Sequence, residues 1–274
     1  MDWSDGASYV GAWELGYASG QGTFIDCLGN KYVGCFKMSM AHGKGTYTNT
    51  MGAIYEGEWR YDMQHGRGVE KWTNSNSIFT GEFIDGLRNG HGVWLHKNKR
   101  YEGHWKNNMM DGQGTMEWGY TGPPHNGRST VKVPAGGMSG GLDLKKQTSS
   151  FIPDKASGSL IIGADSQGAN ANEKGTYTGH WSANKMDGFG IFKWASGRLY
   201  VGEWASDNKD GVGILSFKGG NEYAGEFVQD KRQGYGYYQW ADNRKFKGWW
   251  YENKQHGLGV YFSPESTTAK FGVW

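Results

Sequence analysis

Aromatic residues and glycines alternate along this chain in a recurring pattern. The segment Tyr55-Glu-Gly-Glu-Trp59 places two rings and a glycine at every second position, with acids between them. Because side chains alternate across a β-strand, the segment predicts a strand with its rings and glycine on one face and Glu56 and Glu58 on the other. A Gly-x-Gly follows, and the fourth and sixth positions from its first glycine are often aromatic, as in Phe192 and Trp194. This second segment predicts a second strand of the same kind.

This pair of strands recurs every 22 to 24 residues, apart from one interruption. A fixed period in this range indicates stacked units, each of which buries its apolar side against its neighbours. No segment has a convincing helical period, so we predict an all-β fold: an elongated single-layer antiparallel sheet of stacked β-hairpins, twisted by its strands into a trough. We expect the rings to line the inner side of the trough and to leave some aromatic surface accessible. The nine repeats start at Tyr9, Tyr32, Tyr55, Phe79, Tyr101, Tyr177, Tyr200, Tyr223 and Phe246.

Glycine has a specific role in this prediction. Side chains that face each other in an antiparallel pair have Cβ atoms about 4.5–5.5 Å apart, which is close enough for a ring to lie over a neighbouring glycine. The residues between the strands are rich in Asn, Asp, Lys and Gly, as in Ala205-Ser-Asp-Asn-Lys-Asp210, and this composition is typical of turns. We therefore expect rings packed over bare backbone, with tight turns joining the strands.

The repeats are interrupted between Tyr101 and Tyr177. We predict that residues 1–118 contain a partial repeat at 1–8 and repeats one to five, and that residues 119–174 form a Gly/Ser/Pro-rich insertion. Residues 175–274 then contain repeats six to nine and the start of a tenth. Two interpretations of the insertion remain open: a solvated loop, or a docking arm that orders against a partner. Its apolar stretch, Ser159-Leu-Ile-Ile162, could add a strand to a sheet edge.

Both ends of the sequence look like half-repeats. Trp3 precedes Tyr9 by six residues, the spacing that other repeats show between this ring and the next start, so it reads as the end of a repeat without its first strand. Gly272 and Trp274 take the glycine and second-ring positions of a tenth repeat. Either the sequence is a piece of a longer chain, or its edge strands pair with other chains, a homo-oligomer among them.

Composition narrows the function classes. The net charge is +2 with both signs interspersed, so nucleic acid is not expected as a partner. The 14 Trp argue against disorder, which lacks aromatic residues. Cys27 and Cys35 do not make a disulfide framework, and we expect two reduced thiols in an intracellular protein. No leader segment and no apolar run of about 18 residues occurs, so neither a signal peptide nor a membrane span is predicted.

Candidate catalytic motifs do not hold up against simpler explanations. The repeated Gly-x-Gly lacks the third glycine and the βαβ context of a dinucleotide site. Gly137-Met-Ser139-Gly-Gly141 fits a nucleophile-elbow pattern formally, but the strand–turn–helix context is missing. The acids Glu56 and Glu58, with their counterparts in other repeats, read as a solvated outer face rather than as catalytic pairs. We therefore predict no enzyme, no catalytic residue and no cofactor.

Histidines precede the first glycine of Gly-x-Gly at His42, His65 and His256, which suggests a ladder of metal ligands as one interpretation. Asp, Asn or Ser takes the same position in other repeats, for example at Asp187 and Asp210. A position that accepts any small polar residue is typical of a turn, so we predict no metal site.

The aromatic-x-Gly-x-aromatic start followed by Gly-x-Gly resembles the membrane occupation and recognition nexus (MORN) repeat family over most of the chain. The resemblance implies a single-layer antiparallel sheet of hairpins, used as a scaffold or as a peptide-binding module. Two start motifs depart from the pattern because they end on Phe36 and Phe83, and Glu70 and Leu215 occupy ring positions of the second strand. We expect a thinner aromatic lining in those repeats.

The leading functional hypothesis is a non-enzymatic scaffold for protein–protein interaction. Trp and Tyr are enriched at binding hot spots, and a groove of rings could hold a helix or an extended peptide, while the sheet edges could pair with a further strand. For each ring, a purely structural role in holding the sheet together stays open. The candidate groove residues are Tyr55, Trp59, Tyr101, Trp105, Tyr200, Trp204, Tyr223 and Trp240.

The resemblance also implies a setting. Long arrays without a kinase domain or a membrane anchor are similar to ciliary radial spoke head proteins and other cytoskeletal scaffolds, so we expect a cytoplasmic location in the cytoskeleton or the axoneme of a cilium or flagellum. One alternative is a phosphoinositide or membrane-surface module, which needs a basic patch; another is the targeting segment of a larger enzyme. The basic candidates, mixed with acids, are Lys97, Lys99, Arg100 and Lys106, or Lys231, Arg232, Arg244, Lys245 and Lys247.

Overall fold

The computed structural model describes residues 1–122, 174–264 and 269–274. These residues fall into two units, of which the first contains Met1–Lys97 and the second contains Asn98–Thr121 together with the described residues up to Trp274. The predicted insertion at 119–174 lies almost wholly outside the described residues. The hypotheses for Ser159–Ile162 and Gly137–Gly141 therefore also lie outside them.

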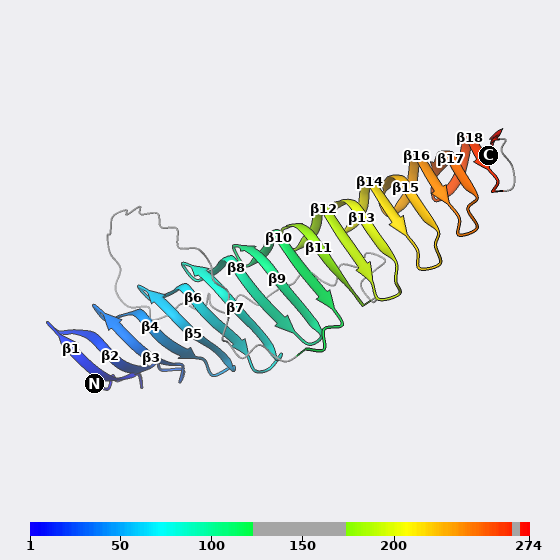
Figure 1. The fold of residues 1–274 in the computed structure, drawn as a ribbon. Helices are drawn as coiled ribbons and strands as arrows, with labels where there is room; N and C mark the ends of the chain where they lie inside the picture. Colours follow the sequence, from blue (N-terminus) through cyan, green and yellow to red (C-terminus); the bar gives the residue numbers. More distant parts are fainter. Residues whose placement is uncertain (123–173, 265–268) are drawn as a thin grey trace. The chain divides into compact units, whose positions relative to one another are not determined.

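The first unit is an open antiparallel sheet in which each strand pairs with the next one along the chain (Figure 1). Its described strands are β1 (Ser8–Glu14), β2 (Tyr17–Ile25), β3 (Lys31–Lys37), β4 (Met40–Thr48), β5 (Ala53–Arg60), β6 (Met63–Trp72), β7 (Ser77–Ile84) and β8 (Leu87–His96). Two strands make one sequence repeat, and successive repeats therefore stack side by side.

The second unit follows the same rule. Its described strands are β9 (Lys99–Lys106), β10 (Met109–Trp118), β11 (Gly175–Ser182), β12 (Lys185–Trp194), β13 (Leu199–Ala205), β14 (Asn208–Ser216), β15 (Glu222–Val228), β16 (Lys231–Gln239), β17 (Lys245–Tyr251), β18 (Lys254–Phe262) and β19 (Ala269–Val273). Strand β10 pairs directly with β11, from Gly112↔Trp181 to Trp118↔Gly175. The fifth and sixth repeats are therefore structural neighbours although they are far apart in the sequence.

A column of facing glycines runs through each sheet. In the first unit Gly57 of β5 faces Gly45 of β4 on one side and Gly68 of β6 on the other. A Cβ built on Gly57 would lie 2.5 Å from Tyr55 Oη and 2.6 Å from the Cα of Gly68, and a Cβ built on Gly68 would lie 2.5 Å from atoms of the Tyr55 ring. The ring thus occupies the space that two side chains would need, which confirms the predicted packing of rings over bare backbone.

The first glycine of each Gly-x-Gly has a different role. Gly66 has φ +62°, in the left-handed region, and the β5–β6 register shifts between Gly57 and Glu58. This is the geometry of a bulge, which glycine adopts without steric cost. Glu58 Oε1 accepts a hydrogen bond from the Arg67 N–H at 3.3 Å, so the outer-face acid supports the backbone of the bulge.

The hairpin turns contain two consecutive residues in the left-handed region, as in Tyr61 (φ 50°) and Asp62 (φ 65°). This is the type I′ geometry that suits the twist of a hairpin, and it favours Asn and Asp. The side chain at the second turn position reaches back to the preceding repeat: Asp62 Oδ1 accepts from the Ala41 N–H at 2.7 Å. The predicted turn chemistry is therefore confirmed, and it also links neighbouring repeats.

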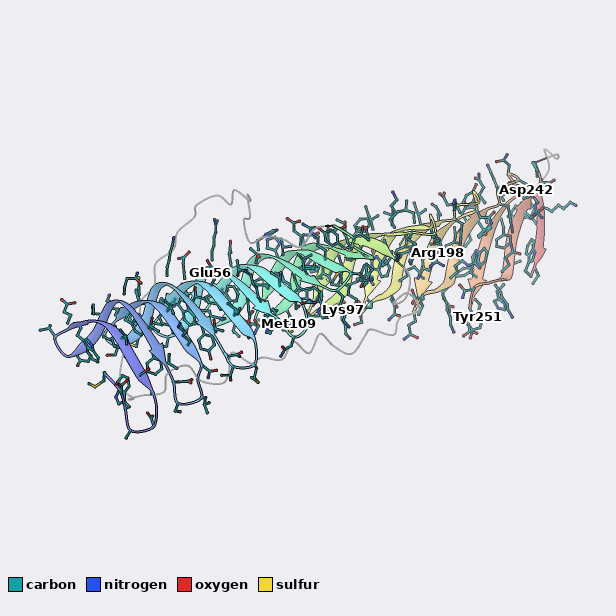
Figure 2. All side chains as sticks on the ribbon, turned by 90° about the horizontal axis from the view of Figure 1, so that it is seen from below. Glu56, Lys97, Met109, Arg198, Asp242 and Tyr251 are labelled. Atoms are coloured by element: carbon teal, nitrogen blue, oxygen red, sulfur yellow. The ribbon has the colours of Figure 1, made fainter. Side chains whose placement is uncertain are left out.

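The fold class is all-β, as predicted, with antiparallel hairpins in open single-layer sheets. No helix occurs in the described ranges, and the search for membrane spans found no helix among those residues long and apolar enough to qualify. Figure 2 shows side chains standing on both faces of the strands. At the C-terminal side, the Trp274 ring packs edge-on against Phe246 with centroids 5.0 Å apart, which is the second-ring position predicted for it.

Candidate functional site

Buried rings form a continuous ladder along one face of each sheet, which we call the inner face. The Tyr200 ring lies edge-on to Trp204 of its own repeat at 5.1 Å and to Phe227 of the next repeat at 5.2 Å. Tyr55 makes the same two contacts in the first unit, with Trp59 at 5.1 Å and Phe83 at 5.0 Å. Each edge-to-face pair contributes about 0.5–1.5 kcal/mol beyond area burial, so the ladder couples successive repeats.

Seven of the eight predicted groove residues belong to this ladder and are buried. Their exposed fractions do not exceed 5 %. The physical reason is that the second ring of the following repeat covers each first ring, so no accessible aromatic lining is found at these seven positions. The seven buried residues are Tyr55, Trp59, Tyr101, Trp105, Tyr200, Trp204 and Tyr223.

The polar atoms of the start-motif rings Tyr200 and Trp59 bond to backbone carbonyls. Tyr200 Oη donates to the carbonyl of Glu203 at 2.9 Å, and burial raises the pKa of this phenol. Trp59 Nε1 donates to the carbonyl of Gly45 in the preceding repeat at 3.0 Å. Phe36 keeps ring contacts at 5.0 and 5.1 Å, so it preserves the ladder and gives up only the indole hydrogen bond. The lining is therefore unbroken at Phe36, whereas no ring stands at the positions of Glu70 and Leu215.

One inner-face position beside the ladder varies from repeat to repeat, and we call it the inner slot. It is the second residue of the second strand, where three repeats have a cation. In the first unit Arg88 Nη2 donates to Glu70 Oε2 at 2.9 Å, with the guanidinium 4.7 Å from the Trp72 ring centre and 4.8 Å from that of Phe79. Glu70, which replaces a ring, thus pairs with the next repeat. Burial raises the pKa of the Glu70 carboxyl, although Arg88 opposes the shift. The nine inner-slot residues are Ala18, Ala41, Gln64, Arg88, Met110, Met186, Lys209, Arg232 and Gln255.

The other two cations lie in the second unit and differ in their partners. Lys209 Nζ forms an ion pair with Asp230 Oδ1, from the next hairpin turn. Arg232 has Asn253 at the equivalent turn position; its backbone N–H donates to Asn253 Oδ1 at 2.9 Å and its Nη2 to the Asn253 carbonyl at 2.8 Å. In the part of the chain that the structure describes, no carboxylate lies within ion-pair distance of Arg232.

Arg232 borders a hollow of about 470 Å³ on the inner face of β16–β19. Its guanidinium lies 4.6 Å from the Trp250 ring centre and 5.4 Å from that of Tyr238. Trp240, the eighth predicted groove residue, is only partly buried and lines this hollow. The lining residues are Arg232, Tyr238, Trp240, Trp250, Asn253, Lys254, Gln255 and Trp274.

Sequence reasoning placed only Trp240 of this hollow among the candidates. A usable signal was present in the combination of two positions. The second turn position is Asp62, Asp207 or Asp230 in three repeats, but the turn that contacts Arg232 has Asn253, so an acid is missing opposite a cation.

The outer face of the second unit carries exposed apolar side chains in cross-strand rows, which we call the outer stripe. Tyr235 of β16 faces Trp249 of β17, and their rings meet edge-on at 5.8 Å. In the first unit, the corresponding pair is Lys44 and Glu58; Glu56, which Figure 2 labels, lies two positions before Glu58 and faces Thr46. The outer stripe consists of Phe189, Ile191, Val212, Ile214, Tyr235, Trp249 and Leu258, all exposed.

Three of the nine basic candidates for a membrane surface form ion pairs with acids. Arg100 contacts Glu102 and, at 3.1 Å, Glu117. Lys231 Nζ lies 2.9 Å from Glu252 Oε1, and Arg244 Nε lies 2.7 Å from Asp242 Oδ2. These pairs leave less free positive charge on the surface than the sequence suggests.

In several repeats, the position before Gly-x-Gly also contacts the next repeat. Asp187 Oδ2 accepts from the Ser206 N–H at 3.2 Å and Asp210 Oδ2 accepts from the Gln229 N–H at 3.2 Å, both in the following hairpin turn. His65 Nδ1 lies 3.5 Å from Asp85 Oδ1 at the same place. Among the described residues no group of three or more His, Cys, Asp or Glu side chains is arranged to hold a metal ion, and Cys27 and Cys35 are both free thiols.

Comparison with solved structures gives two remote likenesses. One is the TCP domain of SAS-4 (dCPAP) from Drosophila melanogaster, in complex with a proline-rich motif of Ana2 (dSTIL), with 12 % identity, TM-score 0.36, and coverage of 84 % of this chain and 90 % of that chain. The other is a mutant of the TCP10 domain of CPAP from Danio rerio, with 9 % identity, TM-score 0.38, and coverage of 92 % and 99 %. Scores this low carry no functional implication. No curated protein matches the chain.

A family model, described as MORN repeat, matches nine segments that together cover more than half of the chain. Each segment begins at one of the nine start residues predicted from the sequence. The segments are 9–27, 32–54, 55–77, 79–98, 101–119, 177–197, 200–222, 223–243 and 246–268. This chain belongs to the MORN repeat family.

Proposed function

We propose that the chain is a non-enzymatic scaffold that binds another protein through the inner face of its second unit. MORN repeats form an interaction module, and the observation that carries the proposal is the hollow beside Trp240. Elsewhere along the ladder, the start-motif rings cover one another. At this hollow, Trp240 and Trp274 border open space instead, and the largely buried Trp250 also lines it. Ring walls of this kind suit an inserted side chain or a peptide segment.

The outer stripe offers a second surface to a protein partner. Exposed apolar side chains gathered on one face favour contact with a partner, although Glu203 and Glu226 face Phe189 and Val212 in this row. Tyr235 and Trp249 are about half exposed, at 44 % and 51 %, and they do not take part in the inner ladder. A protein that contacts both faces would enclose the sheet in its second unit.

The membrane-surface alternative has weaker support. Attraction to an anionic leaflet gains about 1 kcal/mol for each unpaired Lys or Arg near the surface. Arg100, Lys231 and Arg244 each have an acidic partner, which reduces the contribution of these three cations. Flotation with vesicles containing phosphoinositides, at low and at high salt, tests this alternative: strong, salt-sensitive binding would favour it over a protein partner.

The central test is crosslinking mass spectrometry from the native source, compared between the wild type and two variants. Trp240→Ala removes a wall of the hollow, and Trp249→Ala removes the centre of the outer stripe. We expect both variants to keep the β-rich circular dichroism spectrum and Trp240→Ala to lose crosslinks to a partner protein. Unchanged partners in both variants would contradict the proposal.

We further propose that residues 119–174 are an insertion between the fifth and sixth repeats, with repeats at 1–118 before it and at 175–274 after it. The pairing of β10 with β11 supports this division. We also propose a cytoskeletal setting, in a cilium or flagellum or elsewhere in the cytoplasm, on the resemblance of long MORN arrays to radial spoke head proteins. Immunofluorescence of the native protein tests that setting, and a membrane pattern or a linked catalytic domain would favour the alternatives.

A further inference from the structure

The inner slot shows how this fold treats a buried cation. Two of its three cations, Arg88 and Lys209, have a carboxylate partner within the chain, Glu70 and Asp230 respectively. A charge held among rings and out of water is costly unless an opposite charge meets it. The third cation, Arg232, is half-buried and lacks such a partner among the described residues. Burial lowers the pKa of Arg232, which is the expected sign for a desolvated guanidinium without a counter-charge.

The missing partner can be located in the fold. In the repeat that contains Lys209, the next hairpin turn supplies Asp230, whose Oδ1 accepts from the Lys209 backbone N–H at 3.0 Å and also meets its Nζ. Arg232 meets Asn253 in the next hairpin turn. Asn253 keeps the hydrogen bond to the backbone N–H of Arg232 but carries no charge. The turn therefore accepts the backbone hydrogen bond in both cases and neutralises the cation only at Lys209.

The hollow begins where that charge is missing. A guanidinium has five N–H donors, and the hydrogen bonds of Arg232 to the Asn253 carbonyl and to the Tyr238 hydroxyl use only part of this capacity. Lys254 adds a second cation to the lining, and Trp240, Trp250 and Trp274 supply apolar walls. Two cations beside three indoles suit a ligand that carries a carboxylate next to an apolar group.

We propose that the hollow binds an acidic segment of a partner protein, with an Asp or Glu carboxylate on Arg232 and Lys254 and a neighbouring apolar side chain against Trp240. This proposal rests on the proposed function and specifies the chemistry of its partner. The carboxylate takes the place that Asp230 holds opposite Lys209, so the partner completes a pairing that other repeats complete themselves.

The test uses the full chain as the target in a selection of short random peptides displayed on phage. We expect the enriched peptides to carry Asp or Glu beside an aromatic or aliphatic residue. Selected peptides are then synthesised, and their affinity is measured by calorimetry for the wild type and for variants. Matched peptides with Gln or Asn in place of the acid report on the charge alone.

Two variants test the positive charge of Arg232. The first removes it, and the second neutralises it; both use residues that occur at the same positions in other repeats. Arg232→Met copies Met110 and Met186, which occupy the slot in other repeats. Asn253→Asp copies Asp230 and supplies the counter-charge from within the chain; the left-handed φ of 70° at Asn253 matches that of 71° at Asp207. We expect each variant to weaken the acidic peptide about ten-fold or more, as loss of a charge-assisted hydrogen bond does.

The control is Asn184→Asp, the same substitution at the same turn position, where the turn contacts Met110 in the inner slot of the preceding repeat. It should leave peptide affinity unchanged. Enriched peptides that lack acids, or whose affinity survives Asn253→Asp and Arg232→Met, would overturn the acidic-segment proposal and leave the protein-binding function standing. If no peptide is enriched, and phosphoinositide vesicles bind in an Arg232-dependent way, both proposals fail.

Discussion

Asp207 Oδ1 accepts a hydrogen bond from the backbone N–H of Met186, 2.8 Å away and 21 positions earlier in the sequence. The same contact joins Asp62 to Ala41 and Asp230 to Lys209, so a turn residue repeatedly ties its own hairpin to the preceding one. Asn184 makes the contact with an amide oxygen, to the Met110 N–H at 2.7 Å. The hydrogen bond therefore does not require a charge. A buried carboxylate at this position loses hydration free energy, and a neutral amide avoids that cost.

The first prediction concerns pH. Burial raises the pKa of Asp207 above its ordinary value, and Asp187 adds to the shift while the Met186 hydrogen bond and Lys185 oppose it. A carboxyl with a raised folded-state pKa contributes stability below its unfolded pKa of about 3.9 and loses that contribution as the pH rises through the folded pKa. Asp207→Asn removes this dependence and keeps the hydrogen bond.

Urea unfolding of both proteins from neutral pH down to about 4 tests this expectation. The free energy of unfolding of the wild type should gain on that of Asp207→Asn as the pH falls through the raised pKa. Curves that stay parallel, or a variant that gains on the wild type in acid, would contradict the shift.

The second prediction concerns the facing glycines. Gly68→Ala places a Cβ within 2.5 Å of the Tyr55 ring, so the ring has to move and its contacts with Trp59 and Phe83 weaken. We expect a loss of about 2–3 kcal/mol, in the range of overpacked cores. Gly219→Ala is the control, because its Cβ would meet no atom within 4 Å. Thermal unfolding measures both, and equal stability of the two variants would refute the ring-over-glycine account.

The third prediction concerns the buried ion pair. Glu70→Ala leaves the Arg88 guanidinium buried without its carboxylate, which should cost about 3–5 kcal/mol. The preceding repeat has Tyr47 and Gln64 at the corresponding positions, so the double variant Glu70→Tyr with Arg88→Gln should lie within about 1 kcal/mol of the wild type. Chemical unfolding of the single and double variants distinguishes the cases. A double variant as unstable as the single one would show that the pair does more than replace a ring.

The fourth prediction separates packing from surface. Trp204 is 3 % exposed and touches both Tyr177 and Tyr200, so Trp204→Ala should lose about 3–5 kcal/mol. Trp249 is 51 % exposed on the outer stripe, and Trp249→Ala should change stability by less than about 1 kcal/mol. Circular dichroism melts of both variants provide the comparison. Similar losses would mean that the outer rings are structural as well.

Much of this fold was predictable because one repeat specifies it. The alternation of Tyr55, Gly57 and Trp59 sets one face of a strand, and its period places the next strand. The two glycines of Gly-x-Gly look alike in sequence, yet Gly66 serves the bulge through its φ and Gly68 serves the ring through its missing side chain. Sequence alone could not assign those two roles.

The candidate site was harder to predict for a physical reason. A ring such as Tyr200 has the same sequence signature whether the next repeat covers it or leaves it open, and the structure shows it covered. The hollow depends on neighbours from several strands, since Trp274 and Asn253 complete walls that begin at Arg232. A comparison of the charged residues at equivalent positions of the repeats would have indicated the hollow.

The pairing of β10 with β11 also affects how such a chain can change over generations. Thr115 and Thr178 touch through their hydroxyls at 3.0 Å although 63 positions separate them. Any segment that connects β10 to β11 starts and ends on neighbouring strands. The entropic cost of closing such a connection grows only with the logarithm of its length. Evolution could therefore lengthen, shorten or exchange what lies between at small energetic cost to the repeats, which makes this junction a natural place for new modules.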